Sequence, residues 1–127
     1  MNEYKKIPVG ACCPPEDDSQ DLLPIEGKQA EAELAELSRG LAHPARVRIL
    51  RLLVSRGASL CGEIVSELPL AQSTVSQHLK ILKECGWVRG DIDGPRVCYC
   101  ISGKALRRFE ALAGGLGSFD ESSSREN

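Results

Sequence analysis

The stretch bounded by Pro69 and Gly86 constrains the fold of this chain more than any other segment. Its apolar residues recur at the i, i+4, i+7 spacing of one helical face: Val75, Leu79 and Leu82. The proline before the stretch and the glycine after it stop a helix from extending in either direction. The sequence therefore predicts a helix over residues 72–84 with one apolar face.

The opposite face of this predicted helix carries hydroxyls, amides and a cation, with no carboxylate before Glu84. Hydroxyls and amides can hydrogen-bond to base edges and phosphates, and a lysine neutralises phosphate. An ordinary solvated face usually mixes acids with bases, so the missing acids favour a recognition helix in the major groove of DNA. The side chains expected to contact DNA from this helix are Gln72, Ser73, Thr74, Ser76, Gln77 and Lys80.

Around this helix the sequence predicts a mainly α-helical chain with one small β-hairpin. Further helices are expected over residues 28–40, 44–56, 62–68 and 103–113, with a short extended link over 58–61. The predicted buried stripe of the second helix is Val47, Ile49, Leu50, Leu53 and Val54. Asp93-Gly94 between β-prone runs predicts a hairpin of strands 87–92 and 96–101. Residues 62–84 then form a helix–turn–helix, and the hairpin beside it forms a wing.

The charged residues are unevenly distributed along the 127-residue chain, whose net charge is −2. Residues 38–109 carry twelve bases and five acids, whereas residues 1–37 carry nine acids and three bases. A basic middle region suits a polyanion-binding face, although lysine and arginine also simply solvate small domains. Arg89 and Arg96, expected near the tip of the hairpin, are the candidates for contacting the DNA backbone.

We expect three parts: a flexible arm over residues 1–27, a compact domain over 28–114 and a disordered tail over 115–127. Lys5 and Lys6 are followed by no apolar signal core. No apolar run approaches the ~20 residues that are needed to cross a bilayer. The expected location is cytoplasmic, without membrane contact.

Three motifs resemble the ArsR/SmtB family of metal- and metalloid-responsive repressors: residues 41–50 (LAHPARVRIL), residues 69–80 (PLAQSTVSQHLK) and the wing residues 94–100 (GPRVCYC). The resemblance covers roughly residues 30–113. It implies a winged helix–turn–helix homodimer that binds double-stranded operator DNA and releases it when a metal or metalloid inducer binds. Ala71 stands where the family commonly has a serine, which weakens the helix cap by roughly 1 kcal/mol.

Six cysteines are the candidate inducer ligands, because a reducing cytosol disfavours structural disulfides. The zinc site that some family members build from Asp and His on the last helix is not expected, since residues 103–113 contain no histidine. Along the second strand of the hairpin, Cys98 and Cys100 point away from the apolar set, and we expect both on the more open face. In a winged helix the link carrying Cys61 joins the sheet beside this strand. The predicted thiolate site is therefore Cys61, Cys98 and Cys100.

A rival site combines Cys12 and Cys13 of the arm with Cys61. Three thiolates suit a soft ion, so the expected inducer is As(III) or Sb(III), with no organic cofactor. A repressor of the same fold that senses thiol oxidation or persulfides is the alternative, because exposed paired thiols also oxidise. Cys85 is expected to be a small core residue.

An enzyme is not expected, because the sequence has neither a phosphate-binding P-loop nor a cysteine paired with histidine. The two histidines are far apart in the sequence and do not suggest a catalytic site. His43 is expected to cap the helix that begins at Pro44. His78 is expected to pack beside the apolar face of the helix 72–84.

Overall fold

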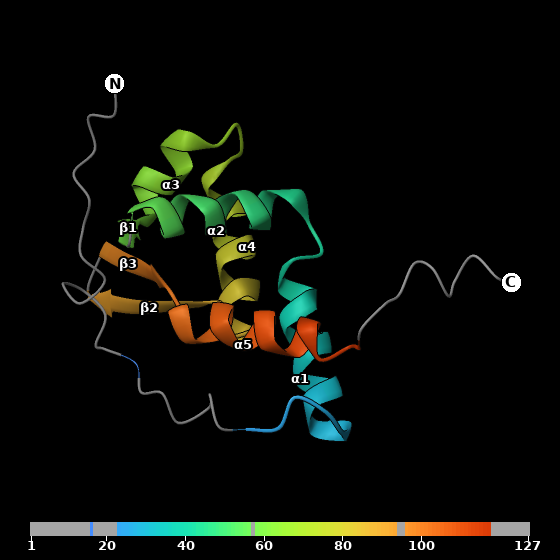
Figure 1. Ribbon diagram of the computed structural model, residues 1–127. Coiled ribbons are helices and arrows are strands. Elements are labelled where there is room, and N and C mark those ends of the chain that lie inside the picture. The colour runs from blue at the N-terminus through green and yellow to red at the C-terminus, as the bar shows by residue number, and fades with distance from the viewer. Residues whose placement is uncertain (1–15, 17–22, 57, 94–95, 118–127) are drawn as a thin grey trace, which may run out of the picture.

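The computed structural model of the protein describes residue 16 and residues 23–56, 58–93 and 96–117, with the backbone alone for 58–62 and 91–97. These residues fold into a group of packed helices with a small sheet at one edge (Figure 1). In chain order the elements are α1 (Lys28–Gly40), α2 (Pro44–Arg56), β1 (Ala58–Leu60), α3 (Cys61–Glu67), α4 (Gln72–Glu84), β2 (Val88–Asp93), β3 (Arg96–Ile101) and α5 (Gly103–Gly114). The predicted winged helix–turn–helix is confirmed.

The strands form one antiparallel sheet in the order β1-β3-β2, so β3 is the central strand. The predicted extended link is β1, in which Leu60 pairs with Cys98 and Ala58 pairs with Cys100. The link is one residue shorter than predicted, because Cys61 is the first residue of α3. The expectation that this link joins the wing sheet beside its second strand is confirmed.

The apolar face of α4 is completely buried, as the spacing predicts, with Val75, Leu79 and Leu82 each 0% exposed. Trp87 follows α4 and extends this core. Its side chain is 2% exposed, and its indole Nε1 donates to the carbonyl oxygen of Leu37 at 2.7 Å. Burying an aromatic ring of this size stabilises the fold strongly when its N–H has a partner. Trp87 therefore connects α1 to the chain that leaves α4.

The predicted buried stripe of α2 is only partly correct. Ile49, Leu50 and Leu53 are buried, whereas Val47 is half-buried and Val54 is 55% exposed. The helical spacing identifies one broad apolar side, but α4 and the sheet cover only part of it. Val54 lies instead along an apolar groove between α2 and α5.

Part of the predicted flexible arm contacts the domain. Arg108 of α5 is 3% exposed, donates to the backbone carbonyls of Leu23 and Pro24, and pairs with Glu33 of α1 at 2.8 Å. Earlier in the chain, Glu16 binds near the start of α5. Residues 1–15 and 17–22 of the arm and the tail beyond residue 117 lie outside the described residues. Within the described residues, no helix combines the length and apolar character needed to span a membrane.

Candidate nucleic-acid interface and thiol site

The exposed face of α4 has the polar composition that the sequence predicted. Ala71 precedes the helix and makes no side-chain cap hydrogen bond, as expected where the serine is missing. The first turn has no acidic residue. Six of the predicted DNA-contacting side chains lie on α4 and all are exposed: Gln72, Ser73, Thr74, Ser76, Gln77 and Lys80. The helix is therefore anchored by its apolar face and offers hydrogen-bonding groups and a cation on the other.

The two wing arginines lie at opposite ends of the hairpin, which corrects the prediction that both are near its tip. Arg96 begins β3 and pairs with Asp93 beside the turn, whereas Arg89 pairs with Cys100 near the base. Arg89 also approaches the N-terminal segment, since its Nε lies 4.0 Å from Oε2 of Glu16. The sequence motif marks a hairpin but does not give the number of paired residues between Arg89 and the turn.

Glu16 connects the N-terminal segment to the start of α5 as well as to the wing. Its carboxylate accepts hydrogen bonds from the Ser102 hydroxyl and, at 3.3 Å, from the backbone N–H of Lys104. Ser102 is itself the N-cap of α5 and accepts the backbone N–H of Ala105 at 3.0 Å. A carboxylate beside a helix N-terminus is favourable because the exposed N–H groups carry partial positive charge. Glu16 thus joins the arm, the wing strand β2 and α5.

Lys83, which sequence analysis did not single out, connects α4 to the wing. Its Nζ donates to the carbonyl oxygen of Gly90 in β2 at 3.4 Å. Tyr99 covers Gly90 so closely that a Cβ there would lie 2.8 Å from the Tyr99 ring. No pattern in the sequence marks Lys83, because its partner is a backbone carbonyl on another element.

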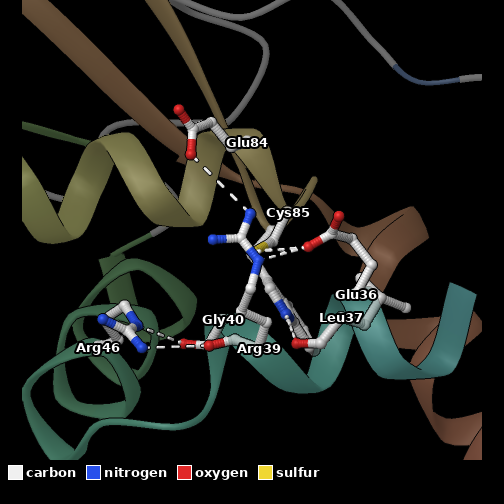
Figure 2. Close-up of polar contacts among 8 residues, drawn as sticks. Glu36, Leu37, Arg39, Gly40, Arg46, Glu84 and Cys85 are labelled. Carbon is white, nitrogen blue, oxygen red and sulfur yellow. Dashed lines mark hydrogen bonds and ion pairs between the residues drawn. The ribbon is translucent and has the colours of Figure 1, made fainter. Parts of the chain in front are cut away.

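A polar cluster joins the C-terminal end of α1 to that of α4 (Figure 2). Arg39 donates to Glu36 at 2.6 Å and lies 3.9 Å from Glu84. The hydrogen bond from Arg39, followed by its charge, lowers the pKa of Glu36. The Cys85 thiol donates to the same carboxylate at 3.7 Å. Cys85 is buried as predicted, and this burial raises the pKa of its thiol, which disfavours the thiolate that a metal ion would need.

Cys98 and Cys100 lie on the central strand, but their exposure differs from the prediction. Cys98 is half-buried and Cys100 is 0% exposed, so the expectation that both thiols are on an open face is wrong for Cys100. Cys100 is nevertheless outside the hydrophobic core cluster to which Ile101 belongs. Strand alternation determines the side of the sheet that a residue faces. It does not determine what covers that side.

The sulfur atoms of Cys98 and Cys100 each take part in a disulfide bond, so the expectation that the cysteines form no disulfides is wrong for these two. The backbone of Cys61 directly follows Leu60, the residue paired with Cys98. The Cys61 side chain lies outside the described part of the structure, as do Cys12 and Cys13 of the rival site. Among the described side chains, no group of three or more His, Cys, Asp or Glu is placed to hold a metal ion.

The two histidines meet in the structure although 35 positions separate them in the sequence. His43 caps α2 as predicted, because its Nδ1 accepts the backbone N–H of Ala45 at 3.0 Å. Its ring centroid lies 4.6 Å from that of His78, which is half-buried on α4. Burial, followed by the charges of His43 and Arg46, lowers the pKa of His78. The neutral form of His78 is therefore favoured in the folded protein.

The family model described as "Bacterial regulatory protein, arsR family" matches residues 43–89, which include α2, the helix–turn–helix and the start of β2. The HTH-type transcriptional regulator Rv0081 of Mycobacterium tuberculosis is 39% identical over 79 residues, which are 62% of this chain and 69% of the relative. The biofilm growth-associated repressor of Agrobacterium fabrum is 36% identical, over 77% of this chain and 83% of its own length. A probable mercury resistance operon repressor of Streptomyces lividans is 34% identical, over 62% of each chain.

Solved structures show the same fold. An ArsR-like transcriptional regulator from Rhodococcus sp. RHA1 matches with a TM-score of 0.64 at 26% identity, over 77% of this chain and 90% of that one. A possible transcriptional regulator for arsenical resistance matches with a TM-score of 0.60 at 30% identity, over 71% and 91%. The match to the family model spans α2 and the recognition helix and ends at the start of the wing. The chain therefore belongs to the ArsR family and is a DNA-binding transcriptional repressor, not an enzyme.

Proposed function

We propose that this repressor leaves its operator when arsenite or antimonite binds to Cys61, Cys98 and Cys100. The observation that carries the proposal is the antiparallel pairing of β1 with β3, in which Leu60 lies opposite Cys98. This register brings the backbone of Cys61 next to the strand that carries the other two cysteines. Soft thiolate ligands select thiophilic ions, and relatives named for mercury and arsenical resistance support the same class of inducer.

The disulfide bonds of Cys98 and Cys100 support the fit of such an ion. A disulfide joins two cysteine sulfurs, so each of these two cysteines has another cysteine beside it. Reduction would leave neighbouring thiols on and around β3. Each thiol can then replace a hydroxyl group of arsenous acid with release of water.

The same disulfide bonds favour a second candidate function, in which oxidation itself is the signal. Two neighbouring thiols lose two protons and two electrons to an oxidant and form a disulfide. Both candidates use the same cysteines and the same DNA-binding face. In the first candidate, the released repressor holds an ion on reduced thiolates. In the second, the released repressor contains a disulfide.

The arm cysteines remain a rival ligand set, and Glu16 supports their access to the sheet. Cys13 lies three residues before Glu16, so the chain between them spans at most about 11 Å. Glu16 is bound to Ser102 directly after β3 and approaches Arg89, the residue paired with Cys100. Cys12 and Cys13 are thus within a short length of chain from the wing sheet.

A change at β3 can reach the recognition helix through the wing. β3 is paired with β2 along six residues, and β2 contacts Lys83 of α4 through the carbonyl of Gly90. In our proposal, ion capture shifts β3 and β2 and rotates α4 away from the spacing that the two half-sites of an operator require.

The discriminating experiment is a gel shift with the reduced protein and the DNA upstream of its own gene. Arsenite, antimonite and the thiol oxidant diamide are added in separate titrations, each followed by excess dithiol. Release by arsenite without oxidant supports the ion-binding proposal. Retention under arsenite with release under diamide supports the redox candidate, and retention under all three contradicts both.

Lys80 provides a test of the proposed DNA face. If its ammonium group neutralises one phosphate, Lys80→Ala should lower the slope of log K against log salt concentration by about 0.9. Fluorescence anisotropy from 50 to 300 mM salt measures this slope. Lys28→Ala removes another exposed lysine, at the start of α1 and outside the helix–turn–helix, and should leave the slope unchanged. Equal slopes for wild type and Lys80→Ala would exclude Lys80 from the interface.

We further propose that the repressor is a homodimer, and that α5 supplies much of its interface. A groove of about 300 Å³ lies between α2 and α5, lined mainly by apolar side chains that include Val54, Leu106 and Phe109. Val54 is 55% and Leu106 is 36% exposed. Contiguous exposed apolar surface of this kind marks interaction sites, and a two-fold dimer matches the symmetry of paired half-sites.

Leu106→Glu should convert the dimer into a monomer, because it places a carboxylate in the apolar groove. Sedimentation velocity at micromolar concentration measures the change as a fall to the monomer mass. Leu116→Glu is the matched control, since Leu116 is 80% exposed and does not line the groove. A Leu106→Glu protein that stays dimeric would show that another surface forms the interface.

A further inference from the structure

Arg46 of α2 makes polar contacts with both α1 and the recognition helix α4. Its Nε donates to the carbonyl oxygen of Gly40 at 3.0 Å, and its Nη2 donates to that of Arg39 at 3.1 Å (Figure 2). These carbonyls belong to the last turn of α1, where no intrahelical N–H is available to them. A cation at this end of a helix is also electrostatically favourable. The guanidinium thus fixes the start of α2 to the end of α1.

The remaining nitrogen of Arg46 reaches the recognition helix. Nη1 lies 3.3 Å from Nδ1 of His78, which is on α4 between the exposed Gln77 and the buried Leu79. Arginine is always protonated and can only donate hydrogen bonds. Nδ1 of His78 must therefore accept, and the single proton of the neutral ring lies on Nε2. An imidazolium carries hydrogen on both nitrogens and cannot make this contact.

Among the groups that the structure describes around His78, none compensates a proton on its ring. The groups that act on it are Arg46 of α2 and His43 of the turn before α2, both of which oppose protonation, as does burial. On α1 and α4, the carboxylates of Glu36 and Glu84 are directed to Arg39. A protonated His78 would face Arg46 with no acid among the described groups that act on it.

We propose that Arg46 is a positioning residue for operator recognition, which orients α4 against the end of α1 through neutral His78, and that protonation of His78 releases this contact and weakens DNA binding. The proposal rests on the operator binding described above. Arg46 needs no contact with DNA for this role, because it acts on the helix that carries Gln77 and Lys80.

The sign of the pH dependence separates this role from ordinary electrostatics. A histidine near a phosphate binds DNA more tightly in acid, because its charge becomes positive. Here acid should weaken binding, because the proton adds a cation beside Arg46 and removes an acceptor. The lowered pKa of His78 has the matching effect on stability: the folded state binds fewer protons than the unfolded state, so stability falls as the pH drops below about 6.5.

The test compares wild type with His78→Asn, whose amide oxygen can accept from Arg46 at the place of Nδ1 but does not titrate. Affinity for the duplex upstream of the protein's own gene is measured by anisotropy from pH 7.5 to 5.5 at constant ionic strength. We expect the wild type to lose affinity severalfold more than His78→Asn over this range, because only the wild-type ring takes up a proton beside Arg46. Equal pH profiles for the two proteins would overturn the proposal.

A second measurement does not depend on DNA. The His78 ring is titrated by NMR in wild type and in Arg46→Lys, which keeps a cation but loses the planar fork of donors. We expect Arg46→Lys to bind DNA at least fivefold more weakly at pH 7.5 and to shift the His78 titration, while circular dichroism shows an intact fold. Unchanged affinity and titration would show that Arg46 does not position α4. Failure of wild type to bind any tested duplex would instead contradict the proposed function.

Discussion

The Cys61→Ser protein is expected to remain bound to operator DNA at arsenite concentrations that release the wild type completely. Cys61 belongs to both proposed ligand sets. One set combines it with Cys98 and Cys100, and the other combines it with Cys12 and Cys13. To move a repressor from almost fully bound to almost fully released, the ion must favour the released form by about 5.5 kcal/mol. Three thiolate bonds can supply this difference, and the loss of one bond removes a large part of it.

Gel shifts at increasing arsenite measure the response, with protein kept reduced throughout. Cys85→Ser is the matched control, because Cys85 is buried, its thiol is hydrogen-bonded to Glu36, and it belongs to neither proposed ligand set. The control should release DNA at the wild-type arsenite concentration. Release of Cys61→Ser at that same concentration would contradict both ligand sets, and counting bound arsenic on Cys98→Ser and Cys100→Ser would then locate the site.

The second large effect is expected from Gly40→Ala, which should lower the free energy of unfolding by about 2–3 kcal/mol. A Cβ at this position would lie 2.5 Å from Cδ1 of Trp87. The indole cannot easily move away, because it is 2% exposed and its Nε1 is bound to the carbonyl of Leu37. Thermal unfolding followed by circular dichroism should show a fall in Tm of roughly 10 °C.

Gly114→Ala is the control for this substitution. Gly114 is also the last residue of a helix, but a Cβ there would meet no atom within 4 Å. Alanine favours helix over glycine, so stability should be unchanged or higher by up to about 1 kcal/mol. A Gly40→Ala protein as stable as this control would mean that the contact between α1 and Trp87 relaxes without cost.

The sequence alone was sufficient to predict the recognition helix and its two faces. Both faces are local properties of thirteen residues. Val75, Leu79 and Leu82 give the apolar face by their spacing, and the polar face carries no acid before Glu84. The hairpin and the capping of α2 by His43 are local as well, since their partners are a few positions away along the chain. Periodicity and turn chemistry describe such features directly.

The candidate thiol site was predicted in part. The pairing of the link before α3 with β3 was anticipated from the winged-helix resemblance, and Leu60 indeed lies opposite Cys98. The burial of Cys100 and the place of Arg89 at the base of the hairpin were not anticipated. Alternation along a strand gives the direction of a side chain, whereas its exposure depends on other segments that pack over it.

Only the tertiary structure determined which polar groups meet. Arg46 and His78 are 32 positions apart, Leu37 and Trp87 are 50 apart, and Glu16 and Ser102 are 86 apart. A residue's own neighbours in the chain set its helical or extended conformation, so the sequence could determine the elements of this repressor and the chemistry of its DNA-facing helix. The partner of a buried arginine, histidine or tryptophan is set by how those elements pack, because desolvated polar groups must find hydrogen bonds wherever the packing brings them.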